Sequence, residues 1–430
     1  MEQSKRIKEV KEKVFVSAYA CEPDLGSEIG VGWHWVLEMS KYFELWVLTR
    51  KSNQDTIETW MNKQEKTYDI HFVYFDLPKR LRFWKKGLRG VRTYYSIWQY
   101  LTNKIVKKTM EENGIKIYHL LTYGNSLWPA SRYGMKQFFV WGPTGGVDTI
   151  PAEYSKYYDK KSRMIEFARR MIVKTLSLNR GFQKRCKNAN LILCKSHYMY
   201  QAVPEKYRDK ALLFTDVAVE MMLVNEVVNL QKRDNCIKYI VVGKLDAWRG
   251  FDILIEAFEK AYRQNSDIRL EVLGKGTDKE RLERMIAERD LKDVVTMTDE
   301  VSMVEYFEKV KDADVIVNSS LKEGAVTVSF DSMALSKPLI CVDTGGYTRY
   351  FDNDYSVILK RGSREKLVND MSDAIMKLTD PQIREKMGKK ANDIGSRYTW
   401  EYKGKEIYNT IMKEYKKEIN VYDESNGDNS

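Results

Sequence analysis

The sequence of 430 residues has few of the side chains that build disulfide frameworks or metal sites. Its five cysteines, at positions 21, 186, 194, 236 and 341, are odd in number and show no paired spacing, and its four histidines are widely scattered. An odd and unpaired set of cysteines favours a reducing compartment such as the cytoplasm. We therefore expect no disulfide framework and no structural or catalytic metal site.

Long hydrophobic runs are also missing. No stretch of eighteen or more consecutive apolar residues occurs, so no transmembrane helix is expected. The first ten residues, MEQSKRIKEV, lack the apolar core of a signal peptide. These absences predict a cytoplasmic protein, and the length predicts two domains of about 200 residues each.

The net charge of +11 is concentrated in two segments. Residues 77–110 hold ten Lys or Arg and no acid, and residues 160–187 hold ten Lys or Arg and one acid, Glu166. The two segments together carry +19, so the rest of the chain carries about −8. The positive charge therefore belongs to two patches rather than to the whole surface.

Both basic segments also contain apolar side chains. Residues 79–89 mix cations with aromatics, as a segment lying on an anionic bilayer would. Residues 163–174 place apolar side chains at helical spacing with cations between them. This second segment either lies on a membrane or packs its apolar stripe on its own domain, and the sequence leaves both open. Nucleic acid is a weaker option because no recognised binding module accompanies the charge.

Short apolar runs alternate with helical segments along the chain, which predicts α/β architecture with buried parallel strands. The predicted strands are residues 14–20, 44–50, 69–77, 115–121, 138–141, 191–194 and 211–214 in the first half, and 237–243, 268–273, 293–297 and 315–317 in the second. A long helix is expected up to about residue 113. A last amphipathic helix opens at residue 398 and ends near 415, and residues 423–430 are expected to be disordered.

A glycine-rich loop follows the first strand, with the sequence CEPDLGSEIGVGWHW at residues 21–35. Gly26 is expected to turn the chain and Ser27 to cap the following helix, while Gly30 and Gly32 leave one flank bare for a ligand or the other domain. The spacing is not the G-x-G-x-x-G of dinucleotide sites, and the second strand ends without an acid for an NAD ribose. An NADP site that uses Arg50 stays open.

Residues 313–346 combine a strand, a polar turn, a helix, a second strand and a glycine loop. The turn carries Glu323 and Gly324, and Asp331 follows on the helix eight residues after Glu323. A helix that begins just after a strand points free N–H groups and a positive dipole end into the crevice above the sheet. Because such a crevice binds anions, we expect a negatively charged ligand between the two carboxylates.

These stretches resemble family 4 retaining glycosyltransferases, which have the GT-B fold. The resemblance rests on the Glu323 to Asp331 spacing and on Lys244 and Arg249, and the runs at 17–35 and 141–146 are similar to one subgroup of that family. It implies two Rossmann-like domains that face each other across a cleft. The domains would be an acceptor-binding domain at 1–220, a nucleotide-sugar domain at 221–396, and a helix and tail at 397–430 that return to the first domain.

The resemblance also implies roles for individual residues. Glu323 would hold hydroxyls of the donor sugar, and Asp331 would bind the ribose. Lys244 and Arg249 would grip the diphosphate, although the family usually has these two residue types in the opposite order. A catalytic role is expected for Glu323, Lys244, Arg249 and His119. The further residues expected around the substrates are Gly26, Ser27, Gly274, Val301, Gly324, Ala325 and Val326.

The implied reaction is a metal-independent transfer of a sugar, with retention, from a UDP- or GDP-sugar to a saccharide or lipid-linked acceptor in cell-envelope, capsule or exopolysaccharide synthesis. The enzyme would be cytoplasmic, could contact the inner face of an anionic membrane, and would need no other cofactor. Ala325, Val326 and Asp331 depart from the family pattern, which keeps a catalytically silent GT-B scaffold or partner subunit open. A sugar-nucleotide epimerase-like GT-B enzyme is a third reading. Cations near Glu323 disfavour a retaining hydrolase.

Overall fold

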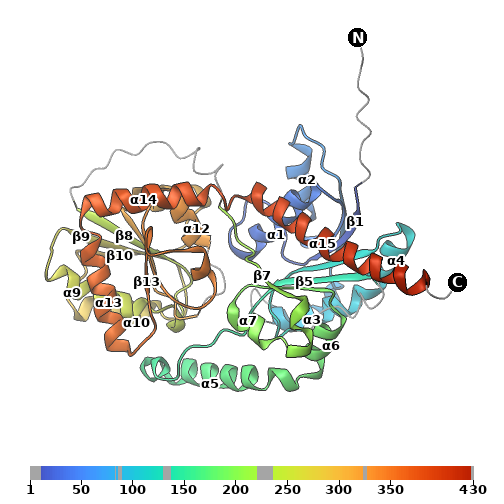
Figure 1. Cartoon of the computed structure of the whole chain (residues 1–430). Coiled ribbons are helices and arrows are strands. Elements are labelled where there is room, and N and C mark those ends of the chain that lie inside the picture. Colours follow the sequence, from blue (N-terminus) through green and yellow to red (C-terminus); the bar gives the residue numbers. More distant parts are fainter. Residues whose placement is uncertain are drawn as a thin grey trace, which may run out of the picture.

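Two parallel β-sheets form the centres of two domains in the computed structural model, which describes residues 11–82, 84–85, 90–128, 137–219, 236–322 and 327–427. The first domain lies on the right of Figure 1 and the second on the left, and the long helix α15 (Trp400–Gly427) leaves the second domain and runs along the first. The predicted α/β arrangement of two Rossmann-like domains is confirmed. The predicted boundary at 220/221 lies outside the described residues.

The first sheet has seven strands in the described part of the chain, in the order β3-β2-β1-β4-β5-β6-β7, and each neighbouring pair is parallel. The strands are β1 (Lys13–Ala18), β2 (Glu44–Arg50), β3 (Ile70–Phe75), β4 (Ile117–Thr122), β5 (Phe138–Thr144), β6 (Leu191–Cys194) and β7 (Ala211–Leu213). The strand order reverses between β1 and β4. At such a switch point, open α/β sheets bind ligands beyond the carboxyl ends of the strands.

The second sheet repeats this order with six strands in the described residues, β10-β9-β8-β11-β12-β13. They are β8 (Ile237–Val242), β9 (Ile268–Leu273), β10 (Val295–Thr298), β11 (Val315–Asn318), β12 (Leu339–Val342) and β13 (Ser356–Leu359). Its switch point lies between β8 and β11. The second sheet therefore has its own ligand-binding edge, as the first does.

Alternate side chains of β1 enter two cores, one on each face of the first sheet. Phe15 packs into a cluster with Tyr118 and Phe182. Val14 and Val16 pack into a different cluster, on the side where α15 lies. Because strand side chains alternate between faces, a sheet covered on both faces needs apolar residues at successive positions. This explains the continuous apolar runs of the sequence.

Helices cover both sheets. Those of the first domain are α1 (Ser27–Ser40), α2 (Gln54–Asn62), α3 (Val91–Leu101), α4 (Asn103–Glu112), α5 (Lys160–Lys174), α6 (Arg180–Asn188) and α7 (His197–Ala202). Those of the second are α9 (Phe251–Tyr262), α10 (Lys279–Glu288), α11 (Met303–Asp312), α12 (Thr327–Ala334), α13 (Arg364–Lys377) and α14 (Pro381–Gly395), followed by α15 (Trp400–Gly427). Short 3-10 turns are η1 (Lys51–Asn53), η2 (Lys79–Leu81), η3 (Tyr154–Tyr157), η4 (Leu176–Leu178), η5 (Glu205–Lys210), η6 (Ala247–Arg249) and η7 (Tyr347–Tyr350).

The helix expected to reach residue 113 without a break is in fact two helices, α3 and α4. Thr102 separates them, and its hydroxyl donates a hydrogen bond to the carbonyl oxygen of Trp98 at 2.9 Å. A threonine hydroxyl that bonds to the preceding turn competes with the regular helical pattern. The prediction of one long helix was wrong because this local side-chain contact has no signal in hydrophobic spacing.

Helix α15 returns to the first domain, as predicted. Trp400 stacks on the imidazole of His34 in α1, with ring centroids 4.8 Å apart. Ile407 and Ile411 complete the core beneath α1. The helix continues to Gly427 and is joined near its end by an ion pair of Lys417 with Glu414 at 2.9 Å. The expected disordered tail from residue 423 was therefore wrong over residues 423–427, which belong to this helix.

Candidate functional site

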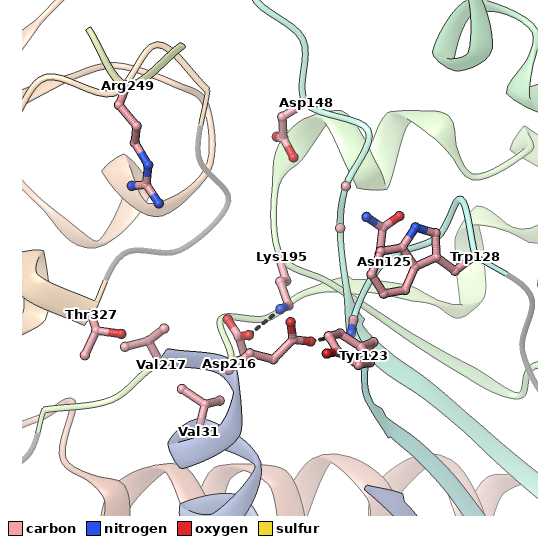
Figure 2. Close-up of a pocket in the computed structure, with 14 residues that line it drawn as sticks. Val31, Tyr123, Asn125, Trp128, Asp148, Lys195, Asp216, Val217, Arg249 and Thr327 are labelled. Atoms are coloured by element: carbon pink, nitrogen blue, oxygen red, sulfur yellow. Dashed lines mark hydrogen bonds and ion pairs between the residues drawn. The ribbon is translucent and has the colours of Figure 1, made fainter. Parts of the chain in front are cut away.

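A cavity of about 320 Å³ lies between the two domains. It opens at the carboxyl ends of the strands of the first sheet, and Figure 2 shows its walls. Its lining residues are Glu28, Val31, Tyr123, Gly124, Asn125, Trp128, Gly145, Gly146, Asp148, Lys195, Asp216, Val217, Arg249 and Thr327. The two domains thus contribute unequal sets of side chains to one polar space.

Glu28 projects from the first turn of α1 into the cavity. Its carboxylate accepts a hydrogen bond from the backbone N–H of Gly124 at 2.8 Å, which ties the start of α1 to the loop after β4. In the same loop, the rings of Tyr123 and Trp128 pack at 5.0 Å between centroids. The first-domain wall therefore combines a fixed carboxylate with an aromatic surface, a combination that suits a polyhydroxylated ligand.

Two further carboxylates face the cavity from different segments. Asp216 forms an ion pair with Lys195, which follows β6, and Asp148 lies in the loop after β5. Both aspartates are less than 9% exposed. Among the described residues, the Oδ1 atoms of Asp148 and Asp216 are buried oxygens without a hydrogen-bond partner. A buried acceptor without a hydrogen-bond partner costs free energy. These two oxygens are therefore candidates to accept hydrogen bonds from hydroxyl groups of a ligand.

The loop that carries Asp148 is held from below by α5. The guanidinium of Arg169 donates to the carbonyl oxygens of Gly146 and Asp148, at 2.7 and 3.0 Å. Gly146 has φ +88°, and a Cβ atom there would lie 2.6 Å from the side chain of Asn125. Only glycine fits this position, so the loop comes close to Asn125 and the cavity wall stays closed at that point.

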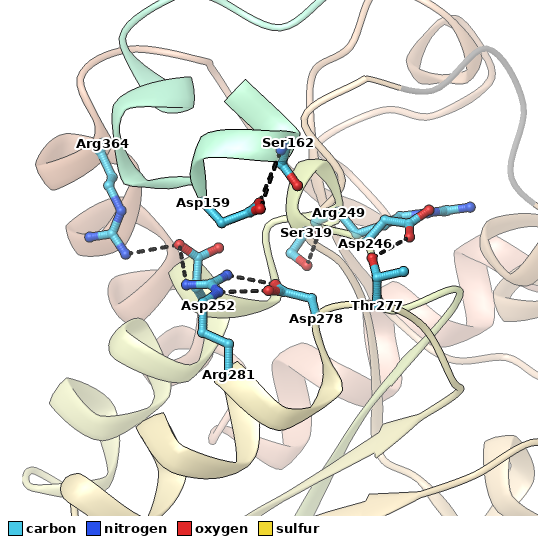
Figure 3. A network of polar contacts seen from close by, with 10 residues as sticks. All are labelled: Asp159, Ser162, Asp246, Arg249, Asp252, Thr277, Asp278, Arg281, Ser319 and Arg364. Atoms are coloured by element: carbon cyan, nitrogen blue, oxygen red, sulfur yellow. Dashed lines mark hydrogen bonds and ion pairs between the residues drawn. The ribbon is translucent and has the colours of Figure 1, made fainter. Parts of the chain in front are cut away.

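The second-domain wall is cationic. Arg249 ends η6, and its guanidinium lies over the ring of Trp248 at 4.5 Å and beside Gly243. The backbone of the same turn is fixed by Ser319, whose hydroxyl donates to the carbonyl oxygen of Arg249 at 2.8 Å (Figure 3). Gly250 follows with φ +67°, and a Cβ atom there would lie 2.4 Å from the carbonyl oxygen of Ser319. The turn therefore needs glycine to bring Arg249 to the cavity.

Lys244 does not line the cavity. Its ammonium lies 3.1 Å from a carboxylate oxygen of Asp246, and its side chain is 58% exposed. Asp246 also accepts from the hydroxyl of Thr277, as Figure 3 shows. The expected pairing of Lys244 with Arg249 around one ligand is not present in this arrangement, because the neighbouring carboxylate holds the ammonium.

The strongest cation network of the second domain is structural. Asp252 in α9 is buried and contacts Arg364 at 3.3 Å and Arg281 at 3.9 Å (Figure 3). Arg281 in turn binds Asp278 at 2.6 Å. These contacts join α9, α10 and α13 away from the residues that line the cavity. Arg281 and Arg364 therefore serve packing within this domain.

The residues expected to carry the donor sugar, Glu323, Gly324, Ala325 and Val326, lie outside the described residues. The chain on either side is described. Lys322 is buried and forms an ion pair with Glu166 of α5. Thr327 begins α12 and lines the cavity.

Asp331 and Tyr306 form a buried pair. Asp331 is 1% exposed, and its carboxylate accepts a hydrogen bond from the hydroxyl of Tyr306 at 2.6 Å. Burial raises the pKa of Tyr306 well above its ordinary value, so this hydroxyl stays protonated as a donor. Asp331 does not line the cavity, and the ribose contact expected of it stays a prediction.

Gly274 and Val301 flank the second sheet at its carboxyl edge. A Cβ atom on Gly274 would lie 2.0 Å from the carbonyl oxygen of Gly243, so the ends of β8 and β9 approach each other only because glycine is present. Val301 is half-buried and precedes Ser302, which caps α11 through a reciprocal contact with Glu305. Neither Gly274 nor Val301 lines the cavity.

His119 is fully buried in β4 and does not line the cavity. Its Nε2 atom lies 2.6 Å from the carbonyl oxygen of Gly142, to which it must donate. Burial lowers the pKa of His119 to about 4, an effect that this hydrogen bond only partly opposes. The imidazole is therefore neutral near pH 7 and holds the loop after β5, and the catalytic role expected of it stays a prediction.

Gly26 and Ser27 lie at the beginning of α1, one turn from the cavity. The helix begins at Ser27, and Gly26 is the N-cap residue, so the expected cap by Ser27 was wrong by one position. A Cβ atom on Gly26 would lie 3.3 Å from the sulfur of Met303 in the second domain. On Gly30 and Gly32 it would lie within 2.0 Å of the carbonyl oxygens of Leu25 and Ala20.

The bare flank of α1 is therefore filled by the chain's own loop and not by a ligand. This corrects the reading of the two helix glycines. The residue of this motif that lines the cavity is Glu28, which directly follows the predicted site residues Gly26 and Ser27. Its signal was present in the Gly-Ser-Glu run. Lys195 and Asp216 had no such signal, because each lies alone in a loop and only the fold brings them together.

Two absences can be stated for the part of the chain that the structure describes. There, no three or more His, Cys, Asp or Glu residues gather in a way that could hold a metal ion. In the same residues, no helix combines the length and the apolar character needed to cross a bilayer. The five cysteines are unpaired, and four of them are buried.

Comparison with known proteins finds a family match for part of this chain. Residues 225–393 match the family described as "Glycosyl transferases group 1", and these residues form most of the second domain. A stretch of 221 residues is 22% identical to an uncharacterized glycosyltransferase of Methanocaldococcus jannaschii, over 51% of this chain and 58% of that protein. The chain spans less than two thirds of the length of the curated relatives it matches.

Solved structures show the same fold over nearly the whole chain. WaaG, a glycosyltransferase involved in lipopolysaccharide biosynthesis, superposes with a TM-score of 0.60 at 13% identity, over 93% of this chain and 99% of that one. HepE of Anabaena in complex with UDP-glucose superposes with a TM-score of 0.57 at 13% identity, over 93% and 99%. The chain therefore has the GT-B fold, and its second domain matches the group 1 glycosyl transferases.

Proposed function

We propose that the protein is a glycosyltransferase that moves a sugar from a nucleotide-sugar donor to a saccharide or lipid-linked acceptor. The observation that carries this proposal is the unequal cavity between the two domains. Arg249 stands on the wall of the domain that matches the group 1 glycosyl transferases, and three carboxylates stand on the other wall. A cationic wall suits a diphosphate, and an acidic wall suits the hydroxyl groups of an acceptor.

The donor side needs groups that stabilise charge growing on the β-phosphate. Arg249 presents a forked guanidinium that is well matched to phosphate oxygens, and its backbone is fixed by Ser319 and Gly250. Residues 323–326 follow the buried Lys322 and precede Thr327 on the cavity wall, and we assign to them the contacts with the donor sugar and diphosphate. HepE binds UDP-glucose on the same fold, which favours a UDP-sugar over a GDP-sugar.

We assign the transfer to a front-face reaction with retention at the anomeric carbon. The bond between that carbon and the β-phosphate oxygen breaks, and the acceptor oxygen forms its new bond on the same face. The acceptor proton passes to the departing phosphate oxygen, so atoms and charge balance without a further co-reactant. Arg249 stabilises the leaving diphosphate, a preorganised contact of the kind that contributes about 10²–10³ in rate.

The acceptor side is the wall made by Glu28, Asp148 and Asp216. These carboxylates can accept hydrogen bonds from hydroxyl groups, and a sugar ring can pack on the indole ring of Trp128. A phosphate-bearing acceptor group would be repelled there, so we assign the reacting end of the acceptor as an uncharged or amino sugar. The reaction would take place in the cytoplasm, at or near the inner face of the membrane, in envelope, capsule or exopolysaccharide synthesis.

A thermal-shift screen against UDP-, GDP- and ADP-sugars tests the donor site, with and without EDTA. We expect a higher Tm with UDP-sugars, unchanged by EDTA, because a ligand that binds only the folded state stabilises it. A shift that EDTA abolishes would contradict the metal-independent assignment. The anomeric configuration of the transferred sugar, measured by NMR on the product, tests retention directly.

A catalytically silent GT-B scaffold is the second candidate. It is favoured by two observations, namely that the ammonium of Lys244 lies beside Asp246 and that Asp331 receives the hydroxyl of Tyr306. A silent scaffold predicts a folded protein whose Tm no nucleotide sugar raises. An epimerase-like enzyme would instead convert the donor when no acceptor is present.

A further inference from the structure

Helix α5 has an unusual distribution of side chains for a surface helix. Five of its large apolar residues face solvent, and Leu178 of η4 continues this exposed surface. The exposed fractions are 68% for Met164, 53% for Ile165, 59% for Phe167, 46% for Met171, 53% for Ile172 and 75% for Leu178. A helix on the surface of a globular protein normally turns its apolar stripe toward the core. Here the expectation that the stripe packs on its own domain is wrong.

The inward face of α5 is polar and firmly held. Glu166 is buried and forms an ion pair with Lys322 of the second domain. One turn further on, Arg169 donates to the carbonyl oxygens of Gly146 and Asp148. Rotating the helix to bury its apolar stripe would expose Arg169 and break the ion pair of Glu166. The apolar face is therefore fixed outward by contacts on the opposite side of the helix.

The charges around this apolar face are positive. Lys160, Lys161, Arg163 and Lys174 are all exposed. The only acid within residues 160–187 is Glu166, which is buried. Asp159 precedes the helix and caps it, with its carboxylate accepting from the backbone N–H of Ser162 at 3.1 Å. An apolar stripe with a cationic margin complements an anionic lipid surface, because the apolar side chains enter the acyl boundary while the cations meet the headgroups.

We propose that α5 and η4 dock the protein on an anionic lipid bilayer. In Figure 1, α5 runs along the edge of the molecule opposite α14 and α15, so a flat surface can meet it without meeting the crossing helix. The docked helix also holds the loop of Gly146 and Asp148, which lines the cavity. The consequence, that the cavity receives its acceptor from the membrane, rests on the proposed function, whereas docking itself does not.

Sedimentation of the full chain with lipid vesicles tests this proposal. The vesicles contain phosphatidylcholine alone or phosphatidylcholine with phosphatidylglycerol, at low and at high salt, and no nucleotide sugar is added. We expect the protein to sediment with the anionic vesicles at low salt and not with the neutral ones. Absence of binding to anionic vesicles at low salt would overturn the proposal.

Two double variants separate the apolar and the charged parts of the surface. Phe167→Ser with Ile172→Ser removes exposed apolar side chains, and Lys160→Glu with Lys161→Glu reverses charge at the helix start. Each is expected to weaken vesicle binding by about tenfold or more. If either variant binds as wild type does, α5 is not the docking face.

Matched controls carry the same changes elsewhere on the surface. Val304→Ser with Tyr402→Ser removes residues that are 64% and 51% exposed, and Lys389→Glu with Lys416→Glu changes exposed lysines of α14 and α15. Both are expected to bind vesicles as wild type does, and equal loss in them would overturn the assignment to α5.

A second readout separates lipid from protein partners. Sedimentation velocity without lipid should show the same monomeric species for wild type and the α5 variants. A dimer that the Phe167→Ser, Ile172→Ser variant abolishes would show that a second copy covers this face, and would overturn the lipid proposal. Failure of docking would leave the donor thermal shift unchanged, so the two proposals can fail separately.

Discussion

The two domains share one strand order but bring opposite chemistry to the cavity between them. In the first, the start of α1 supplies Glu28, and the loops beyond the strands supply Asp148 and Asp216, the latter paired with Lys195. In the second, the corresponding edge supplies Arg249 and the start of α12 at Thr327. A common topology therefore fixes where a ligand can bind, and the residues just after the strands decide which ligand it is.

The loops after the first strand of each domain show how this difference arises. After β1, the chain folds back so that its carbonyl oxygens touch Gly30 and Gly32 of α1, which fills that flank. After β8, Gly243 leaves room above the sheet, and the guanidinium of Arg249 occupies it. The glycines of the first loop serve packing, and the glycine of the second supports a ligand-facing cation.

Removing one partner of the buried ion pair between the domains should have the largest effect. Glu166→Ala leaves the buried Lys322 without its carboxylate, and we expect the free energy of unfolding to fall by about 3–5 kcal/mol. Chemical denaturation measures this change. The Glu166→Met, Lys322→Met double variant should recover most of the loss, since it removes both charges.

A surface pair provides the control for that experiment. Lys366 lies 2.6 Å from Asp370, and its side chain is 63% exposed. Lys366→Ala should therefore change stability by about 0.5 kcal/mol or less. A Glu166→Ala variant as stable as the Lys366→Ala variant would contradict the large contribution predicted for the buried ion pair.

Removing the cation of the second-domain wall comes next. Arg249→Ala should lower the rate of sugar transfer by about 10²–10³, because a preorganised donor to the leaving diphosphate is lost. Steady-state transfer from a UDP-sugar measures this. Arg263→Ala is the matched control, since Arg263 is 75% exposed on the same domain and pairs with Glu259 on its own helix. Equal activity of both variants would refute the role of Arg249.

A change in the first-domain wall should lower kcat/KM for the acceptor and leave the affinity for the donor unchanged. Asp148→Asn keeps the shape of the side chain and removes its charge. We expect kcat/KM for the acceptor to fall by about 10–100-fold, which corresponds to the loss of one hydrogen bond to a charged group. Donor affinity should not change. A variant that loses donor affinity instead would place Asp148 on the wrong side of the cavity.

Acidification should destabilise the packing of α15 against α1. Burial lowers the pKa of His34, which stacks on Trp400, to about 4. In the unfolded chain, His34 binds a proton with the ordinary pKa of about 6.5. The unfolded state is therefore increasingly favoured as pH falls from about 6.5 toward 4. Because of His34, the free energy of unfolding should therefore fall by about 1.3 kcal/mol when the pH is lowered from about 7.5 to about 5.5.

His34→Phe keeps a ring against Trp400 and removes the titrating group. Its loss of stability between the two pH values should be smaller than that of wild type by this amount, as measured by chemical denaturation. His119 is buried in the same neutral state and contributes its own loss, so some pH dependence should remain. An unchanged pH dependence in the His34→Phe variant would contradict the buried neutral imidazole.

The sequence predicted the strands well because burial on both faces leaves a strong apolar signal. Val14 to Val16 and Val315 to Val317 are examples that became β1 and β11. The crossing helix was also predicted correctly. The orientation of α5 could not be read, because its apolar spacing is the same whether the stripe faces the core or solvent, and only Glu166 and Arg169 decide between the two.

The cavity was predicted only in part. Arg249 was found through the family resemblance, because Lys244 and Arg249 together stand in register with Glu323 further along the chain. Asp216 was missed because nothing in its local sequence separates it from an ordinary loop acid, and only β6 brings Lys195 beside it. For His119 the sequence could not decide, because a histidine at a strand end suits catalysis and burial equally well, and the structure shows that it is fully buried.

The division of labour between the two walls is the central claim, and calorimetric titration of a UDP-sugar into three proteins tests it most directly. Wild type and Asp148→Asn should bind the donor with the same Kd. Arg249→Ala should bind at least about tenfold more weakly, because a charge-assisted contact to the diphosphate is lost. Equal affinity in all three proteins, or an equal loss in both variants, would contradict the account.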